Sequence, residues 1–116
     1  MTINAPSSNR FNERTRLVLD FVIAAAQRYG HPNRVILFGS RARGDGRPTS
    51  DYDIAVDPDA NLAKNWARFW LDVDEEAPTL CSIDLVCLDD SLSPGLRLAI
   101  ESEGLVFAGT SNGNEP

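Results

Sequence analysis

The chain has 116 residues, 42% of them hydrophobic and 24% charged, and its 11 Lys and Arg against 17 Asp and Glu give a formal net charge of −6. This composition predicts one soluble folded domain that can bury a core without disulfide or metal staples. The acidic balance argues against a protein that mainly grips nucleic-acid backbones, because such binding needs clustered Lys and Arg. No apolar run reaches the length of a membrane span and no signal sequence opens the chain, so we expect a cytoplasmic protein with neither nucleic acid nor membrane as a direct partner.

Both ends of the chain are polar and rich in Asn, Ser, Gly and Pro. We therefore expect residues 1–9 and 109–116 to be flexible and residues 10–108 to form the domain. Cys81 and Cys87 lie in one apolar segment, with no further Cys or His at the spacing of a metal site. We expect them to be buried, reduced thiols without a part in function.

The first half of the domain contains two predicted helices and two predicted strands. Hydrophobic residues at helical spacing predict a helix from Phe11 to Tyr29, which a Gly and a Pro then end. The apolar run Val35–Phe38 predicts a strand that is buried on both faces. A short helix is expected to open at Ser40, and Asp51–Val56 predicts a second strand after a polar segment broken by Gly and Pro.

The second half continues the same alternation. Apolar side chains from Asn61 to Val73 recur at helical spacing, so we expect one helix there with Asn61 as its N-cap. We predict a third strand over Cys81–Leu88, a helix over Ser93–Glu103 with a Pro in its first turn, and a last strand over Leu105–Ala108. The expected fold class is α/β (α+β), a small mixed sheet with helices mainly on one face, because the strands carry carboxylates on the other.

Gly39 and Ser40 follow directly on the first predicted strand, and ten residues later comes an Asp-Tyr-Asp segment, in the pattern GSx10DxD. A Gly at a strand end permits a tight turn and the close approach of a ligand, and the N–H groups that follow favour an anion. Ser40 adds a hydroxyl donor, and Arg41 and Arg43 add guanidinium groups, which suits the phosphates of a nucleotide. For Gly39 and Ser40 alone, the alternative is a plain strand-to-helix turn with Ser40 as its N-cap.

Three carboxylates complete the candidate site. Alternation along a strand places Asp51 and Asp53 on one face and Tyr52 on the apolar face. Like charges so close favour a hard cation such as Mg²⁺ between them, the alternative being that Asp51 caps the strand and Asp53 faces water. Asp84 interrupts the apolar run of the third predicted strand, so we expect a buried carboxylate beside the other two. Three carboxylates beside a phosphate-binding turn suit two-metal phosphoryl or nucleotidyl transfer.

These segments, Gly39-Ser40, Asp51-Tyr52-Asp53 and Ile83-Asp84-Leu85-Val86, resemble those of the DNA-polymerase-β-type nucleotidyltransferase superfamily. More narrowly, the chain is similar to the minimal nucleotidyltransferases, the MntA-like antitoxins encoded beside a helical HEPN-domain toxin of the HepT type. The resemblance covers about residues 35–108 and implies a polymerase-β-like nucleotidyltransferase fold. Tyr52 departs from the family pattern, in which an aliphatic residue is usual at this position.

The resemblance implies a role for each of these residues. Asp51 and Asp53 would each hold both of two Mg²⁺ ions, and Asp84 would complete the catalytic ion and orient or deprotonate the attacking hydroxyl. Gly39 and Ser40 would hold the triphosphate of ATP. The implied reaction is attack of an acceptor oxygen on the α-phosphorus, with pyrophosphate as the leaving group. In the family the acceptor is a tyrosine of the cognate toxin, an RNase that the modification silences.

Three functions from different classes remain open. The first is an adenylyltransferase that modifies a partner toxin, and the second is nucleotidyl transfer to a small molecule with a separate helical subunit. The third is a non-catalytic module that neutralises a toxin by contact, which the three carboxylates disfavour. An incomplete acceptor pocket leads us to expect a heteromer or homo-oligomer. Trp66 and Trp70, one helical turn apart, either pack in the core or present a ring to a partner.

Overall fold

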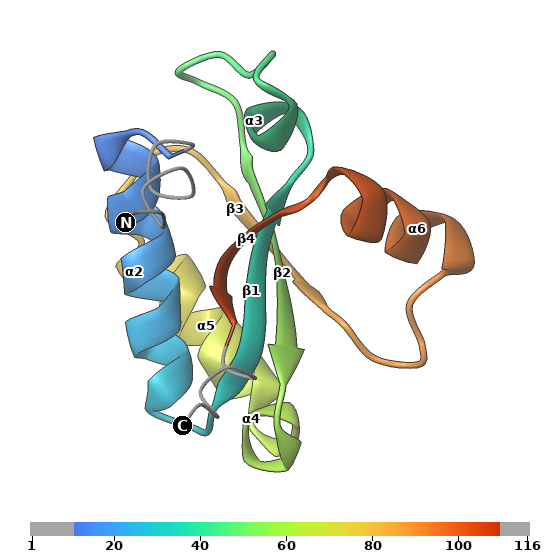
Figure 1. The fold of residues 1–116 in the computed structure, drawn as a ribbon. Helices are drawn as coiled ribbons and strands as arrows, with labels where there is room; N and C mark the ends of the chain where they lie inside the picture. Colours follow the sequence, from blue (N-terminus) through green and yellow to red (C-terminus); the bar gives the residue numbers. More distant parts are fainter. Residues whose placement is uncertain (1–10, 110–116) are drawn as a thin grey trace, which may run out of the picture.

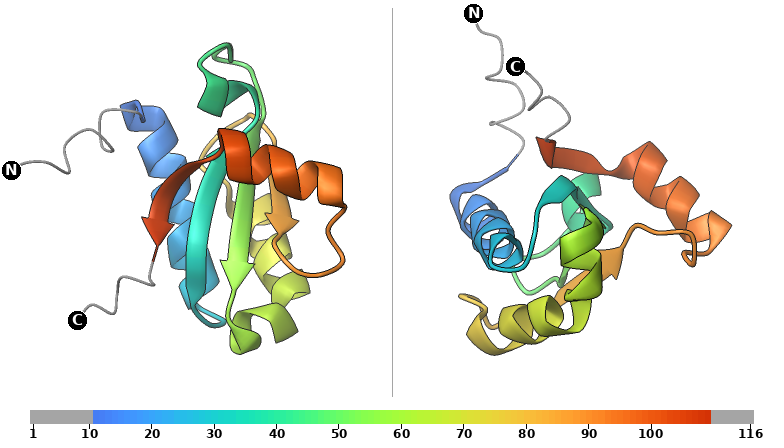
Figure 2. Two further views of the ribbon diagram at one scale, coloured as in Figure 1. Left: turned by 45° about the vertical axis from the view of Figure 1, so that its right-hand side comes forward. Right: turned by 90° about the horizontal axis from the view of Figure 1, so that it is seen from below.

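The computed structural model describes residues 11–109, which form a four-stranded sheet with helices packed against both faces (Figure 1). The elements in chain order are α2 (Glu13–Gln27), β1 (Pro32–Phe38), α3 (Ser40–Arg43), β2 (Tyr52–Pro58), α4 (Ala60–Lys64), α5 (Trp66–Glu76), β3 (Ile83–Cys87), α6 (Pro94–Glu103) and β4 (Leu105–Gly109). Figure 2 shows α2 and α5 on one side of the sheet and α6 on the other. The predicted alternation of helices and strands is confirmed, with one predicted helix split in two.

The strand order in the sheet is β3-β2-β1-β4. β1 pairs antiparallel with β2 and β4, whereas β2 and β3 run parallel, so the sheet is mixed as predicted. Because β1 and β2 run in opposite directions, the end of β1 lies beside the start of β2, and the parallel pairing brings the start of β3 to the same edge. We call this region the carboxylate end, since it carries Asp51, Asp53 and Asp84.

β1 lies inside the sheet and is buried on both faces, as its apolar run predicts. Val35 and Leu37 face the larger core, Ile36 and Phe38 face the smaller one, and all four are at most 9% exposed. The larger core lies under the helices on the first face. Its buried side chains include Val18, Leu19, Val22, Tyr52, Ile54, Val56, Leu62, Phe69 and Val73. Most helical packing is therefore on one face, and the predicted fold class is confirmed.

α6 covers part of the second face, which also carries the carboxylates. Its anchor is Ile100, which is only 1% exposed. The buried side chains clustered with Ile100 are Ile36, Phe38, Ala55 and Leu88. Asp53 and Asp84 belong to this same face, because they alternate with Tyr52 and Ile83, which belong to the larger core. We call this second face of the sheet the carboxylate face. It is apolar under α6 and acidic near the strand ends.

The prediction of one helix from Asn61 to Val73 is wrong, because the chain forms two helices that meet at Asn65. Asn65 leaves the helical conformation with φ −108° and ψ 21°, and its Nδ2 donates to Asn61 O at 2.9 Å. The predicted N-cap, Asn61, is also wrong. Asp59 caps α4 instead, since its Oδ1 accepts from Leu62 N at 2.9 Å.

The remaining element boundaries differ from the prediction by a few residues. β1 begins at Pro32, three residues early, and β3 is shorter than the predicted strand over Cys81–Leu88. Gly109 is the last residue of β4 and pairs with β1, so this strand runs one residue beyond its predicted end at Ala108. The predicted domain bounds, residues 10–108, stay a prediction. Of the predicted flexible ends, residues 1–9 and 109–116, all but Gly109 lie outside the described residues.

Candidate functional site at the carboxylate end

The turn after β1 is built around Gly39. Its φ of 77° and ψ of −156° fall in a region of backbone conformation that is open essentially to glycine alone. A Cβ at this position would also collide with Oδ2 of Asp53. Both the backbone conformation and the lack of space for a Cβ require glycine here. The backbone of the predicted phosphate-binding turn therefore lies directly against one of the predicted carboxylates.

Ser40 opens α3, as predicted. The helix is a single turn, in which the N–H groups of Ala42 and Arg43 donate to Gly39 O at 3.1 and 3.0 Å and Gly44 ends the turn with φ 88°. The N-cap position is occupied by Gly39, so the alternative in which Ser40 caps the helix is wrong. Ser40 is half-buried beside the carboxylate end, and its contact with a triphosphate stays a prediction.

The pairing of β2 with β3 brings Asp53 and Asp84 side by side. The two residues are register partners in the parallel pair, and Asp53 also lies opposite Phe38 of β1. Register partners on neighbouring strands, about 4.8 Å apart, direct their side chains to the same face. Asp51 immediately precedes β2 and is exposed, whereas Asp53 is half-buried. The predicted position of Asp84 beside the Asp51 and Asp53 strand is confirmed.

The three carboxylates repel one another. Burial raises the pKa of Asp53 above its ordinary value, and the negative charges of Asp84 and Asp51 raise this pKa further. The guanidinium of Arg43 acts in the opposite direction and lowers it. Because the interaction between charges weakens with distance, the side chains of Asp51, Asp53, Asp84 and Arg43 lie near one another. A cation bound there would relieve the repulsion.

Asp84 differs from its prediction in one respect. Its apolar neighbours in sequence predict a buried carboxylate, but β3 is an edge strand and Asp84 is exposed. The prediction of burial is therefore wrong. At the edge of the sheet the Asp84 carboxylate is solvated, so it avoids the free-energy cost of a charge buried in the core. What distinguishes Asp84 is its position across from Asp53.

Arg43 lies close enough to lower the pKa of Asp53, and two exposed ion pairs hold its guanidinium. Nε lies 3.4 Å from Oδ2 of Asp45, and Nη1 lies 3.4 Å from Oε1 of Glu103. Exposed pairs of this kind are weak, so an anion at the site can compete for the guanidinium. Glu103 was missed in the sequence, because the contact joins residues 60 positions apart and nothing in the local pattern marks it.

Arg41 is placed differently from Arg43. Its guanidinium donates to the backbone carbonyls of Pro48 and Ser50 and lies over the ring of Tyr52. Tyr52 is fully buried in the larger core, as its place on the apolar face predicts. These contacts direct Arg41 toward the loop between α3 and β2, and its contact with a phosphate stays a prediction.

The donor atoms at the carboxylate end suit a hard cation, because carboxylates offer only oxygen. Within residues 11–109, however, no group of three or more His, Cys, Asp or Glu side chains is gathered in a way that could hold a metal ion. Mg²⁺ usually takes one or two protein carboxylates and completes its shell with water and substrate phosphates. Asp53 and Asp84, beside a turn where a Cβ on Gly39 would crowd Asp53, fit a metal that arrives with a nucleotide better than a preformed cage.

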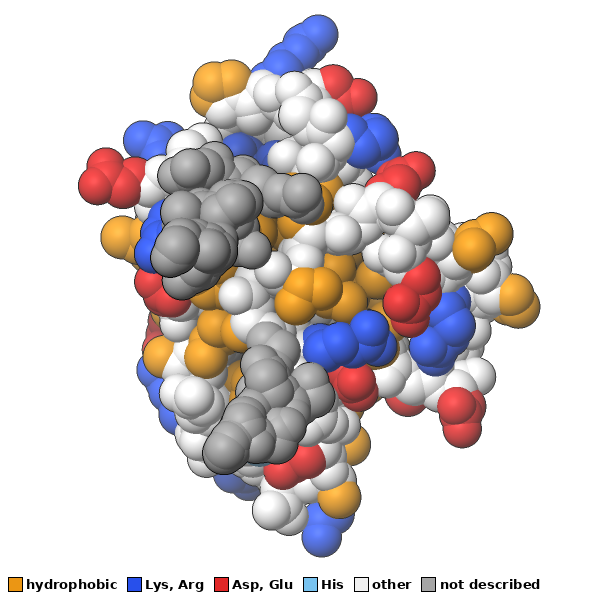
Figure 3. Space-filling model, viewed as in Figure 1, with side chains coloured by type: hydrophobic (Ala, Val, Ile, Leu, Met, Phe, Trp, Pro, Cys, Tyr) orange, Lys and Arg blue, Asp and Glu red, His pale blue; other side chains and the backbone are white. Residues whose placement is uncertain are grey.

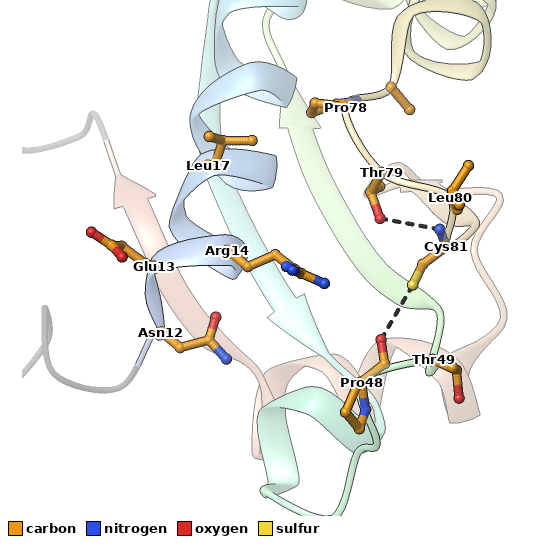
Figure 4. A pocket seen from close by; sticks show the side chains of 11 residues that line it. Asn12, Glu13, Arg14, Leu17, Pro48, Thr49, Pro78, Thr79, Leu80 and Cys81 are labelled. Atoms are coloured by element: carbon orange, nitrogen blue, oxygen red, sulfur yellow. Dashed lines mark hydrogen bonds between the residues drawn. The ribbon is translucent and has the colours of Figure 1, made fainter.

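A large groove in the described part of the molecule lies away from the carboxylate end. It has a volume of about 1120 Å³ and lies between the start of α2, the loop before β2 and the segment that leads into β3 (Figure 4). Its wall includes Arg14 and the exposed side chains of Leu17 and Leu80. None of the three predicted carboxylates lines it, so the groove is separate from the candidate site.

Charged side chains of both signs are interspersed on the face shown in Figure 3. That face presents no continuous basic patch of the kind that grips a phosphate backbone. The expectation that nucleic acid is not a direct partner stays a prediction. Among the described helices, none is long and apolar enough to cross a membrane.

Comparison with known proteins identifies a family. The family model described as polymerase beta, nucleotidyltransferase, matches residues 21–112. The match takes in the turn after β1 and both strands that carry the carboxylates. No curated protein matches the chain in sequence.

Proposed function

The chain belongs to the polymerase beta nucleotidyltransferase family, and from this premise we propose that it is a Mg²⁺-dependent enzyme that transfers AMP from ATP to a protein hydroxyl. One observation carries the proposal. The backbone of the Gly39 turn abuts Asp53, and Asp53 lies across from Asp84 on the neighbouring parallel strand. A phosphate-binding turn and a set of carboxylates in such close contact suit the transfer of a phosphorus group.

The residues of the carboxylate end divide the work between binding and charge. Gly39 and Ser40 bind and orient the triphosphate through the turn, and Arg43 adds positive charge on the same side. Asp51, Asp53 and Asp84 are the residues that would hold Mg²⁺. When bound there, Mg²⁺ offsets the negative charge on the oxygens that enter and leave the α-phosphorus.

The proposed step exchanges one bond at phosphorus for another. The acceptor hydroxyl oxygen forms a bond to the α-phosphorus of ATP, and the bond from this phosphorus to the bridging oxygen of the β-phosphate breaks, so that pyrophosphate leaves. The hydroxyl proton passes to Asp84, which is exposed and can release it to water. Asp84 also orients the hydroxyl for attack.

For the acceptor, we infer a tyrosine on a cognate helical HEPN-type toxin, so that the chain acts as its antitoxin in the cytoplasm. The resemblance to the minimal nucleotidyltransferases supports this acceptor. The surface of α5 supports a protein partner, because Trp70 and Leu71 are 43% and 47% exposed beside the exposed acidic residues Asp74 and Glu75. Trp66, in contrast, is half-buried and packs edge-on against the Phe69 ring at 5.1 Å. We therefore expect the partner to present an apolar surface with basic residues around it, because such a surface complements the apolar and acidic surface of α5.

Labelled ATP tests the proposal. The protein is incubated with Mg²⁺ and ATP labelled at either the α- or the γ-phosphate, alone, with the product of the adjacent gene, or with small hydroxyl compounds. We expect the α label, and not the γ label, on the partner protein. The γ label on the partner would instead mean phosphoryl transfer. Label only on a small molecule would favour the second candidate function, and a bound, neutralised partner without label would mean inhibition by contact.

A further inference from the structure

Arg41 connects the turn after β1 to the loop of residues 44–51, which joins α3 to β2. Its Nε and Nη2 donate to Ser50 O at 3.0 and 2.7 Å, and Nη2 also donates to Pro48 O at 3.0 Å. The planar guanidinium presents several donors in a fixed fork, so one side chain holds two backbone carbonyls at a defined separation. Ser50 is the residue before Asp51, and Arg41 is the residue after Ser40.

The ring of Tyr52 packs against the guanidinium of Arg41. The guanidinium carbon lies 3.9 Å from the ring centroid, in the geometry of a cation–π contact. The Tyr52 hydroxyl is buried and has no hydrogen-bond partner among the described residues. The aromatic face of Tyr52, and not its hydroxyl, is therefore the part of the side chain that contacts Arg41.

Cys81 extends the same contact to the segment before β3. Its Sγ lies 3.8 Å from Nη2 of Arg41. The same Sγ donates to Pro48 O at 3.4 Å (Figure 4). Cys81 precedes Asp84 by three residues. One guanidinium thus contacts the chain immediately before both Asp51 and the strand of Asp84, and it is attached to the helix that begins at Ser40.

We propose that Arg41 is the positioning residue of the carboxylate end, which holds the phosphate-binding turn, Asp51 and the approach to Asp84 in one arrangement without touching the nucleotide. The inference rests on the proposed function for its catalytic consequence, but its structural consequence is independent of that function. It differs from the sequence prediction, in which Arg41 binds phosphate directly. Loss of a group that orients metal ligands typically weakens metal affinity about 10- to 100-fold.

Four variants and one control separate these roles. Arg41→Met keeps the aliphatic stem and removes the fork, and Arg41→Lys keeps the charge but not the planar donors. Tyr52→Leu removes the aromatic face, whereas Tyr52→Phe keeps it and removes only the unpaired hydroxyl. Arg68→Met removes a charge from an exposed position on α5 and serves as the control.

Three measurements apply to every variant. Amide hydrogen exchange over residues 49–51 reports the order of the loop, and the Ser50 N–H, which donates to Arg47 O at 2.9 Å, is a natural probe. Calorimetric titration with Mn²⁺ reports the metal affinity of the carboxylates, and steady-state kinetics of AMP transfer separates kcat from KM for ATP.

We expect Arg41→Met, Arg41→Lys and Tyr52→Leu to exchange at least about 10-fold faster over residues 49–51 and to bind Mn²⁺ at least about 10-fold more weakly. Their kcat falls while KM for ATP changes little, and Tyr52→Phe and Arg68→Met behave as wild type. Unchanged exchange in both Arg41 variants would overturn the positioning role. Unchanged hydrogen exchange together with a raised KM for ATP would instead support the sequence prediction that Arg41 binds phosphate directly. If the wild-type protein transfers no AMP, the proposed function fails, and hydrogen exchange still decides the inference.

Discussion

Gly39 is the residue at which backbone conformation and site chemistry coincide, so its replacement is the sharpest test at the residue scale. In Gly39→Ala, the added Cβ meets Oδ2 of Asp53 in a backbone conformation that L-residues avoid. We expect the free energy of unfolding to fall by about 1–3 kcal/mol from strain alone, and AMP transfer to be lost as Asp53 is displaced. Urea unfolding and the transfer assay measure the two effects.

Gly95→Ala is the matched control for this substitution. Nothing lies within 4 Å of a Cβ at Gly95, in the first turn of α6. Alanine in a helix is more favourable than glycine by up to about 1 kcal/mol, so this variant should be equally or more stable and fully active. If both alanine variants were as stable and active as wild type, the requirement for glycine at position 39 would be refuted.

The raised pKa of Asp53 predicts that the site reduces the stability of the fold. A folded-state pKa above the ordinary value of about 3.9 means that the folded protein binds the proton more tightly than the unfolded chain. Stability is therefore lost as pH rises between these two values, and the penalty persists at neutral pH. Asp53→Asn removes the penalty, so its melting temperature at pH 7 should exceed that of wild type by a few degrees.

Thermal unfolding between pH 4 and pH 7 measures the gap between Asp53→Asn and wild type. We expect the gap to widen as pH rises, because the other titrating groups are common to both proteins. Added Mg²⁺ should narrow it by stabilising only the wild-type protein. A variant that is less stable than wild type throughout this range would show that Asp53 supports the fold.

Residue spacing predicted part of the site and could not predict the rest. The spacing from Gly39 to Asp53 brings both to one end of the sheet, because β1 and β2 are neighbouring antiparallel strands. The burial of Asp84 was predicted wrongly, since an apolar strand does not reveal that it lies at the edge. The reach of Arg41 to the loop carbonyls also has no signal in the sequence, because it depends on the path of an irregular loop.

At the element scale, α6 is the helix that completes the carboxylate face. Ile100 is 1% exposed and packs against side chains of β1 and β2, so Ile100→Ala should lower the free energy of unfolding by about 2–4 kcal/mol. Leu98→Ala is the matched control on the same helix, because Leu98 is 68% exposed and its truncation should cost less than about 0.5 kcal/mol. Chemical denaturation measures both. Equal effects of the two substitutions would mean that α6 does not anchor through Ile100.

The helices show where periodicity is sufficient and where it fails. Hydrophobic spacing predicted α2 closely, and α6 was predicted with a Pro in its first turn. Each helix has a polar N-cap, Asn12 in α2 and Ser93 in α6. The same spacing continues across Asn65, although the chain bends there, because apolar positions on both sides still face one core. Periodicity therefore predicts which side chains are buried and not whether the helix axis is continuous.

At the scale of the whole molecule, the site depends on strand order. Three segments of the chain meet at the site: the turn after β1, the segment before Asp51 and the segment before Asp84. They meet only because β2 lies between β1 and β3, antiparallel to β1 and parallel to β3. The local pattern of a strand contains no information on its neighbours, so the meeting of these segments was inferred from the chemistry of the carboxylates and from family resemblance. The family match covers all of these segments.

AMP transfer by wild type and by Asp53→Asn tests most directly whether the carboxylate end is the catalytic centre. The substitution keeps the size of the side chain and removes its charge, and Gly95→Ala provides a folded control. With α-labelled ATP and the protein partner, we predict that Asp53→Asn loses at least about 100-fold of the transfer rate while its melting temperature equals or exceeds that of wild type. Transfer at the wild-type rate by the folded Asp53→Asn protein would contradict this assignment and move the chemistry to another part of the molecule.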